Sequence, residues 1–187
     1  FSDAAFGNVQ TTLDPFDELK DAVTEDGLVV KNLLKRYQIW LDQELKQDYF
    51  LADVPRRNDL HVYEAVWHFS LYRFLSGYLG NYNIGVIPEF PTGNGKVDIV
   101  LVHDGKRYPI ELKSFSSIPK YHDAVNQAAR YAASLGVSSV VLAFFIDAID
   151  DAHRLKLEVD VPHAETGVMV QIIFLVTGDQ LPKQTIK

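Results

Sequence analysis

Two carboxylates and a lysine lie in neighbouring apolar segments of the chain. Asp98 is within KVDIVLVH (96–103), and Glu111 and Lys113 are within KRYPIELKSF (106–115). Carboxylates form strands poorly and are costly to bury. Their position in such segments indicates either a decorated surface or a cation held between the two acids.

The dipeptide Asp104-Gly105 separates these two segments and predicts a two-residue hairpin turn. This turn places Asp98 directly across from Glu111 in a non-hydrogen-bonded pair, with Cα atoms ~4.5 Å apart. A four-residue loop gives the same register, whereas a three-residue loop shifts it by one. Lys113 shares the face of Glu111 because strand side chains alternate with a period of two.

Apolar side chains occupy both faces of this hairpin, so we expect it to be covered on both sides. Like charges opposed across two strands are destabilising, and burial increases the cost. A divalent cation would remove the repulsion, and carboxylate oxygens suit Mg²⁺ or Mn²⁺. Lys113 could then position a water or stabilise developing negative charge. The alternative is a salt-bridged cluster of the three side chains at a sheet edge.

Hydrophobic periodicity and turn residues predict an α/β core with a mixed sheet. The first helix should begin at an Asp14 cap with Pro15 in its first position, and Asp59 could cap the third. We expect helices over 12–23, 27–45, 60–79 and 122–136, and strands over 83–90, 96–103, 106–115, 137–146, 154–161 and 168–176.

The bulk composition limits the classes of protein to which the chain can belong. The chain has 187 residues, no cysteine and a net charge of −7, from 18 Lys and Arg against 25 Asp and Glu. Disulfides and thiolate metal sites are excluded, and the acidic charge weighs against binding nucleic acid by charge alone. We find no apolar run of membrane-spanning length and no signal segment, so we expect a cytoplasmic protein without membrane association.

The pattern GKVD (95–98) followed by ELK (111–113) resembles the PD-(D/E)XK nuclease superfamily. Gln127 and Tyr131 in QAARY match the Q-x-x-x-Y element of RecB-like members, and Glu64 stands where many members place an additional acid. The resemblance implies a restriction-endonuclease-like core, a mixed central sheet flanked by helices, with an N-terminal helical extension.

Residues 12–187 are also similar to the nuclease-like C-terminal domains of predicted prokaryotic AAA-type ATPases. The shared features include a helical connector, a PEF-x-TG-x-G-x-x-D turn and a final E-x-K. Lys96 stands where members often have Arg. No GxxxxGK[ST] occurs here, so an ATPase would belong to another part of the protein or to a partner. The resemblance divides the chain into a connector, 1–57, and a nuclease-like domain, 58–187.

Metal-dependent hydrolysis of DNA phosphodiester bonds is the activity that the resemblance implies. Asp98, Glu111 and the backbone carbonyl of Leu112 would bind Mg²⁺ or Mn²⁺, with Glu64 as a further ligand, and Lys113 would orient the attacking water. Lys96, Gln127 and Tyr131 would support the site or contact the substrate.

Several of these residues have structural alternatives. Gln127 could be a structural amide and Tyr131 a core aromatic residue. Glu64 could be solvated or paired with His68 or Arg73, and Glu89 is a weaker candidate for the site.

Two further functions stay open at this point. The chain could be a catalytically silent nuclease-fold module that binds or regulates an ATPase partner, and the acidic charge favours this reading. The N-terminal helix pair could also form a homodimer or dock a partner, which excludes neither of the other functions. A basic cleft beside Glu111 would favour the nuclease, and an uncharged or occluded one the silent module.

Overall fold

The structure is a computed structural model that describes residues 19–47, 54–55, 62–93 and 95–178. Four helices and eight strands follow one another along these residues. They are β1 (Val23–Thr24), β2 (Gly27–Leu28), α1 (Val30–Glu44), α2 (Glu64–Leu79), β3 (Gly85–Thr92), β4 (Gly95–His103), β5 (Lys106–Ser114), α3 (Ile118–Ser134), β6 (Ser139–Ile146), α4 (Asp151–Leu157), β7 (Val161–Pro162) and β8 (Met169–Val176).

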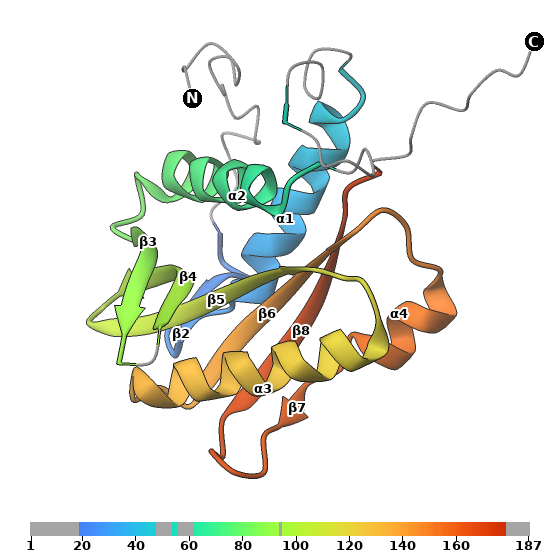
Figure 1. The fold of residues 1–187 in the computed structure, drawn as a ribbon. Coiled ribbons are helices and arrows are strands. Elements are labelled where there is room, and N and C mark those ends of the chain that lie inside the picture. The colour runs from blue at the N-terminus through green and yellow to red at the C-terminus, as the bar shows by residue number, and fades with distance from the viewer. Residues whose placement is uncertain (1–18, 48–53, 56–61, 94, 179–187) are drawn as a thin grey trace, which may run out of the picture.

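A six-stranded mixed sheet with the order β3-β4-β5-β6-β8-β7 forms the centre of the molecule (Figure 1). Strands β3, β4 and β5 are antiparallel, whereas β5, β6 and β8 run parallel. Helices α1 and α2 cover one face of the sheet, and α3 packs on the other. The predicted fold class, an α/β core with a mixed sheet flanked by helices, is confirmed.

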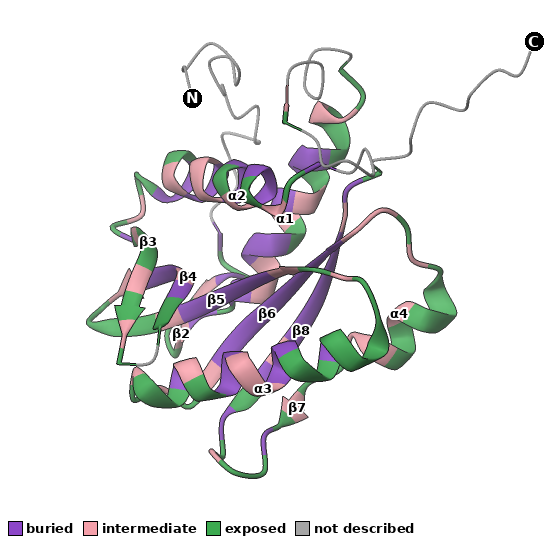
Figure 2. Ribbon diagram, viewed as in Figure 1, coloured by how far each residue is buried: buried purple, intermediate pink, exposed green. Residues whose placement is uncertain are grey.

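Two separate apolar clusters fill the layers on either side of the sheet, and their residues are among those coloured as buried in Figure 2. The first lies under α1 and α2, where Tyr37 and Phe74 meet at 5.4 Å between ring centroids. The second lies under α3 and includes Phe144 and Phe174. Strand β6 contributes alternate side chains to both clusters, as expected of a central strand.

The β4–β5 hairpin has the predicted register. Pairs run from His103–Lys106 to Ile99–Ile110, so the expected alignment is confirmed up to that point. Asp104 and Gly105 have φ values of 48° and 73°, as a type I′ turn requires.

Proline in the middle of β5 is accommodated by the ladders on its two sides. Pro109 lies opposite Val100 in a non-hydrogen-bonded pair, so that its missing N–H is not needed there. On the other side, pairing with β6 begins only at Ile110. Neither neighbouring strand therefore loses a hydrogen bond to this residue.

The N-terminal region is only partly as predicted. The second predicted helix is present as α1, and its Tyr37 hydroxyl donates to Ser70 Oγ of α2 at 3.0 Å. Residues 19–23 are not helical: the amides of Ala22 and Val23 donate to the Leu19 carbonyl in a turn that leads into β1. Leu19 itself is buried in the cluster under α1 and α2. The rest of that predicted helix, including Asp14 and Pro15, lies outside the described residues.

The domain boundary that we predicted at residue 57 also lies outside the described residues, as does Asp59. Side chains from both sides of this boundary share the α1–α2 cluster. Residues on the two sides of the predicted boundary therefore contribute to one apolar core.

Helices α2 and α3 differ from the predicted ranges at their N-termini. Helix α2 begins at Glu64, after the expected residue 60. Helix α3 begins at Ile118, earlier than the expected residue 122, because Ser117 caps it and Pro119 lies in its first turn. Both helices end close to the predicted glycines.

The predicted strand over 154–161 is wrong. Asp150 accepts a hydrogen bond from the His153 amide and caps α4, and Arg154 pairs with Glu158 one turn further on. The alternating pattern had suggested a half-buried strand, but Leu155 is 79% exposed. Only Val161 and Pro162 form the short strand β7. Polar capping therefore outweighs the alternation in this segment.

The outer edge of β8 is closed by side chains where β7 does not reach. Strand β7 pairs only with Met169 and Val170. Further along, Gln38 of α1 accepts from the Val176 amide at 2.7 Å and donates to its carbonyl at 2.9 Å. Glu158 accepts from the Phe174 amide, and Arg154 donates to its carbonyl. Side chains thus take the place of a neighbouring strand.

Candidate active site

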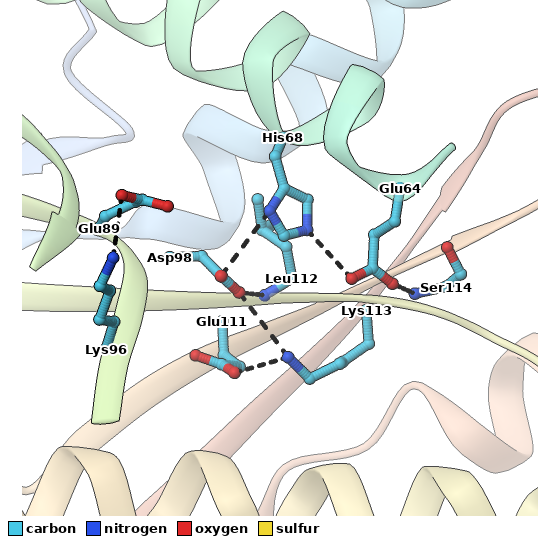
Figure 3. A network of polar contacts seen from close by, with 9 residues as sticks. All are labelled: Glu64, His68, Glu89, Lys96, Asp98, Glu111, Leu112, Lys113 and Ser114. Atoms are coloured by element: carbon cyan, nitrogen blue, oxygen red, sulfur yellow. Dashed lines mark hydrogen bonds and ion pairs between the residues drawn. The ribbon is translucent and has the colours of Figure 1, made fainter. Parts of the chain in front are cut away.

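The pairing of β4 with β5 ends just before Asp98 and Glu111, the two acids of the predicted site (Figure 3). The β4–β5 pairing ends at Ile99–Ile110, and Asp98 Oδ2 then accepts from the Leu112 amide at 2.7 Å. The side chain of Asp98 therefore replaces a main-chain partner and is held at a fixed place between the two strands.

The neighbouring strand is irregular at the same level. The β3–β4 register pairs Pro88 with Ile99 and Phe90 with Val97, and it skips Glu89 and Asp98. Glu89 has φ of 48°, which is unusual for a residue other than glycine. Strain of this kind is often concentrated at functional sites.

Lys113 lies between the two acids that the sequence predicts to meet. Its Nζ donates to Glu111 Oε1 at 2.7 Å and is 3.9 Å from Asp98 Oδ2. Glu111 and Lys113 pair with Leu142 and Phe144 of β6, which belong to the cluster under α3. Both side chains therefore point to the α3 side of the sheet, as Figure 3 also shows.

Glu111 is the most deeply buried acid of the site, with only 2% of its surface exposed. Burial, followed by the charge of Asp98, raises the pKa of Glu111 from the usual 4.5 to about 7, although Lys113 acts in the opposite direction. Its Oε2 is buried and has no hydrogen-bond partner among the described residues. An unpaired buried carboxylate oxygen is costly, and it is a natural ligand for a cation.

The charge state of Lys113 is determined mainly by its contact with Glu111. Burial alone would lower the pKa of Lys113, but the charge of Glu111 and the hydrogen bond to it outweigh this effect and raise that pKa. Asp98 and Glu64 contribute in the same direction. Lys113 is therefore held as an ammonium ion beside the carboxylates.

Helix α2 brings two more polar side chains to the site from the other face of the sheet. Glu64 Oε2 accepts from the Ser114 amide at 2.6 Å, which fixes the start of α2 against the end of β5. His68, one turn later, has Nε2 3.6 Å from Glu64 Oε1 and Nδ1 3.7 Å from Asp98 Oδ1. His68 thus bridges the two acids.

His68 was not predicted as a site residue. The sequence signal that could have identified it is the i, i+4 spacing from Glu64 on one helix face. Its Nε2 is buried and without a hydrogen-bond partner in the described part of the chain. His68 therefore adds a second unsatisfied donor or acceptor to the site, on the side of its ring that faces Glu64.

The donor set fits a divalent metal in its chemistry. It consists of carboxylates, one of which has a buried oxygen without a partner, and an imidazole nitrogen. Mn²⁺ accepts both kinds of ligand, and Mg²⁺ prefers the oxygens. Within the residues described, no three His, Asp or Glu side chains already stand in position to hold an ion together. Side-chain rotation, including release of Glu111 from Lys113, would be required.

The remaining predicted residues lie around this centre. Leu112 pairs with Ala143 in the β5–β6 ladder, while its amide contacts Asp98. Lys96 is exposed and pairs with Glu89 at 3.2 Å. Gln127 Nε2 donates to the Tyr131 hydroxyl at 2.8 Å, and both residues line a pocket beside α3.

No helix in the described ranges is long and apolar enough to cross a membrane. Curated proteins give no match to this chain. Among solved structures, SfsA from Pyrococcus furiosus in complex with Ca²⁺ is similar at 13% identity and a TM-score of 0.34. The alignment covers 60% of this chain and 58% of the SfsA chain.

A family profile described as "Domain of unknown function (DUF8371)" matches residues 28–147. This range runs from β2 to the end of β6 and contains every residue of the candidate site. The chain belongs to the DUF8371 family of domains.

Proposed function

We propose that this chain is a metal-dependent nuclease that hydrolyses phosphodiester bonds of DNA. The observation that carries the proposal is Glu111, a buried carboxylate with one unpaired oxygen, held beside Asp98 and an ammonium group. A structural salt bridge alone would not require an oxygen without a partner. A cation and a phosphate oxygen would satisfy both Glu111 and Lys113.

The residues of the site would have distinct roles. Asp98 and Glu111 would hold Mg²⁺ or Mn²⁺, with Glu64, His68 and the Leu112 carbonyl as the further groups available. When bound, the metal would lower the pKa of a water and neutralise charge on the phosphoryl oxygens. The Lys113 ammonium would orient the attacking water and stabilise the negative charge that develops at phosphorus.

A catalytically silent module that works with an AAA-type ATPase is the second candidate. Two observations favour it: Lys113 is bonded to Glu111, and no three ligand side chains converge among the described residues. The net charge of −7 also weakens general attraction to DNA. Intact Asp98, Glu111 and Lys113 favour the nuclease.

Cleavage of labelled linear, circular and single-stranded DNA with Mg²⁺, Mn²⁺ or EDTA would test the proposal. We expect metal-dependent cutting that Lys113→Ala reduces by about a hundredfold or more. Lys156→Ala, which removes an exposed lysine from α4, is the matched control and should cut like wild type. Folded protein that cuts no DNA with either metal would favour the silent module instead.

A further inference from the structure

A polar pocket lies beside the middle of α3, on the same side of the sheet as Glu111 and Lys113. It has a volume of about 560 Å³ and is lined by Asp123, Asn126, Gln127, Arg130 and Tyr131. Of these, only the Gln127–Tyr131 pair was expected from the sequence. The other lining residues raise the question of which ligand the pocket fits.

A buried histidine fixes the orientation of Asn126 in this pocket. His163 lies in the turn before β8 and is 9% exposed. The Thr166 amide donates to its Nδ1 at 3.3 Å, and the Thr166 hydroxyl is 2.9 Å from the same atom. Because a backbone amide can only donate, Nδ1 is an acceptor and the ring proton of the neutral imidazole resides on Nε2.

The proton on Nε2 determines which end of the Asn126 amide faces the histidine. His163 Nε2 is 3.2 Å from Asn126 Oδ1, so the oxygen accepts from the ring. The Asn126 NH₂ group then points away from His163, and no partner for it is found within the described residues. Two N–H donors are therefore available to a ligand.

Tyr131 and Arg130 add further donors. The Tyr131 hydroxyl accepts from Gln127 Nε2, which leaves its own proton available to a ligand. Arg130 is exposed and carries a guanidinium group. Asp123 is the one acid in the lining. Donors outnumber acceptors, which suits an anionic ligand rich in oxygen.

The pocket lies next to the candidate active site along β4. A Cβ placed on Gly95 would be 2.8 Å from the Tyr131 hydroxyl, so that this side chain reaches the first residue of β4. Asp98 is three residues further along the strand, roughly 10 Å at 3.3 Å per residue. One phosphate group cannot reach both places, whereas two phosphates of one strand can.

We infer that this pocket binds a backbone phosphate of a polynucleotide strand next to the phosphate at Lys113, with Asn126 as a direct donor that His163 positions. The inference rests on the proposed function for its choice of ligand. It extends that function by assigning a second contact on the substrate, at residues that the motif does not include.

Binding of a labelled oligonucleotide, measured by fluorescence anisotropy in EDTA, tests the inference without cleavage. Asn126→Asp keeps an oxygen for His163 but replaces the NH₂ donors by negative charge. We expect it to weaken binding about tenfold or more. Asn81→Asp, which adds the same charge in the exposed turn after α2, should bind like wild type. Equal affinities for the two variants would overturn the inference.

The positioning role of His163 needs a measurement that a merely structural role would not change. His163→Phe should weaken binding in the wild-type chain but not in the Asn126→Asp background. Equal losses in both backgrounds would overturn that role. Inorganic phosphate should compete only weakly, because it provides a single contact. Full competition by inorganic phosphate would show a site for free phosphate and overturn the choice of a strand.

These outcomes separate the two proposals. DNA cutting together with an Asn126→Asp variant that binds normally would contradict the inference and leave the nuclease standing. Binding that depends on Asn126, from protein that cuts with no metal, would contradict the nuclease and support the phosphate site.

Discussion

Lys113 Nζ donates to Glu111 Oε1 at 2.7 Å, while the second oxygen of the same carboxylate is buried without a hydrogen-bond partner in the described structure. The pair is therefore only half satisfied. Buried charges that are incompletely paired reduce stability. Such a cost is common where a group is held ready for a ligand rather than for the fold.

The first prediction concerns the pH dependence of stability. Glu111 has a folded-state pKa of about 7, above its usual 4.5, so the folded protein binds more protons than the unfolded chain between these values. The free energy of unfolding should therefore fall as pH rises from 4.5 through 7, by about 3 kcal/mol from this group. Glu111→Gln should lack that fall, as measured by urea unfolding in EDTA.

The matched control for Glu111→Gln is Glu165→Gln, which removes an exposed carboxylate from the turn before β8. Its unfolding free energy should run parallel to that of wild type over the same pH range. If Glu111→Gln also runs parallel to wild type, the buried carboxylate does not titrate as its surroundings indicate.

The second prediction concerns Glu64 of α2. Glu64→Gln retains an oxygen that can accept from the Ser114 amide, so the helix position should be preserved. If Glu64 contributes charge to a metal site, Mn²⁺ binding measured by calorimetry should weaken by about tenfold or more. Glu89→Gln, an exposed acid paired with Lys96, should have a much smaller effect. Identical Mn²⁺ affinities for both variants would remove Glu64 from the site.

The third prediction concerns the glycine at the start of β4. Gly95 has φ of +148°, and an added Cβ would be 2.8 Å from the Tyr131 hydroxyl. Gly95→Ala should therefore lower stability by about 1–3 kcal/mol, measured by thermal unfolding. Adding Tyr131→Phe should recover the part that comes from the contact with the hydroxyl. Gly93→Ala, where a Cβ meets nothing within 4 Å, should be nearly neutral. Equal losses at both glycines would contradict this reading.

The fourth prediction concerns the edge of β8. Gln38→Leu removes both hydrogen bonds to Val176 and should lower stability by about 1–2 kcal/mol. The uncovered strand edge should also increase self-association, measured by light scattering. Lys35→Leu places the same side chain at an exposed position of α1 and serves as the control for added apolar surface. Equal self-association of the two variants would show that Gln38 does not protect the edge.

Local signals in the sequence account for most of the fold. The Asp104-Gly105 turn and the alternating apolar residues determine the β4–β5 register, and periodicity predicts α1, α2 and β6. The failures occur where local hydrogen bonds override periodicity. The side-chain cap of Asp150 converts a predicted strand into α4, and the main-chain turn at Leu19 replaces the last residues, 19–23, of a predicted helix.

The candidate site also has a part that the sequence predicts and a part that it does not. Spacing along one hairpin brings Asp98, Glu111 and Lys113 together, because the strand register is a local property. The i, i+4 spacing marks His68 as a neighbour of Glu64. Its contact with Asp98 depends on how α2 packs across the sheet, so the spacing does not predict that contact. The same applies to His163 and Asn126, which are far apart in the chain and meet only through tertiary packing.

The length of the tight turn at Asp104 and Gly105 determines where the distant Glu111 lies relative to Asp98. Each residue added to or removed from it would slide β5 along β4, and an odd change would carry Glu111 and Lys113 to the opposite face of the sheet. Surface loops usually tolerate changes in length. Here the length of a solvent-exposed turn is tied to the arrangement of the candidate site at the other end of the hairpin. A change in that length would move Glu111 and Lys113 away from Asp98 without altering any residue of the candidate site.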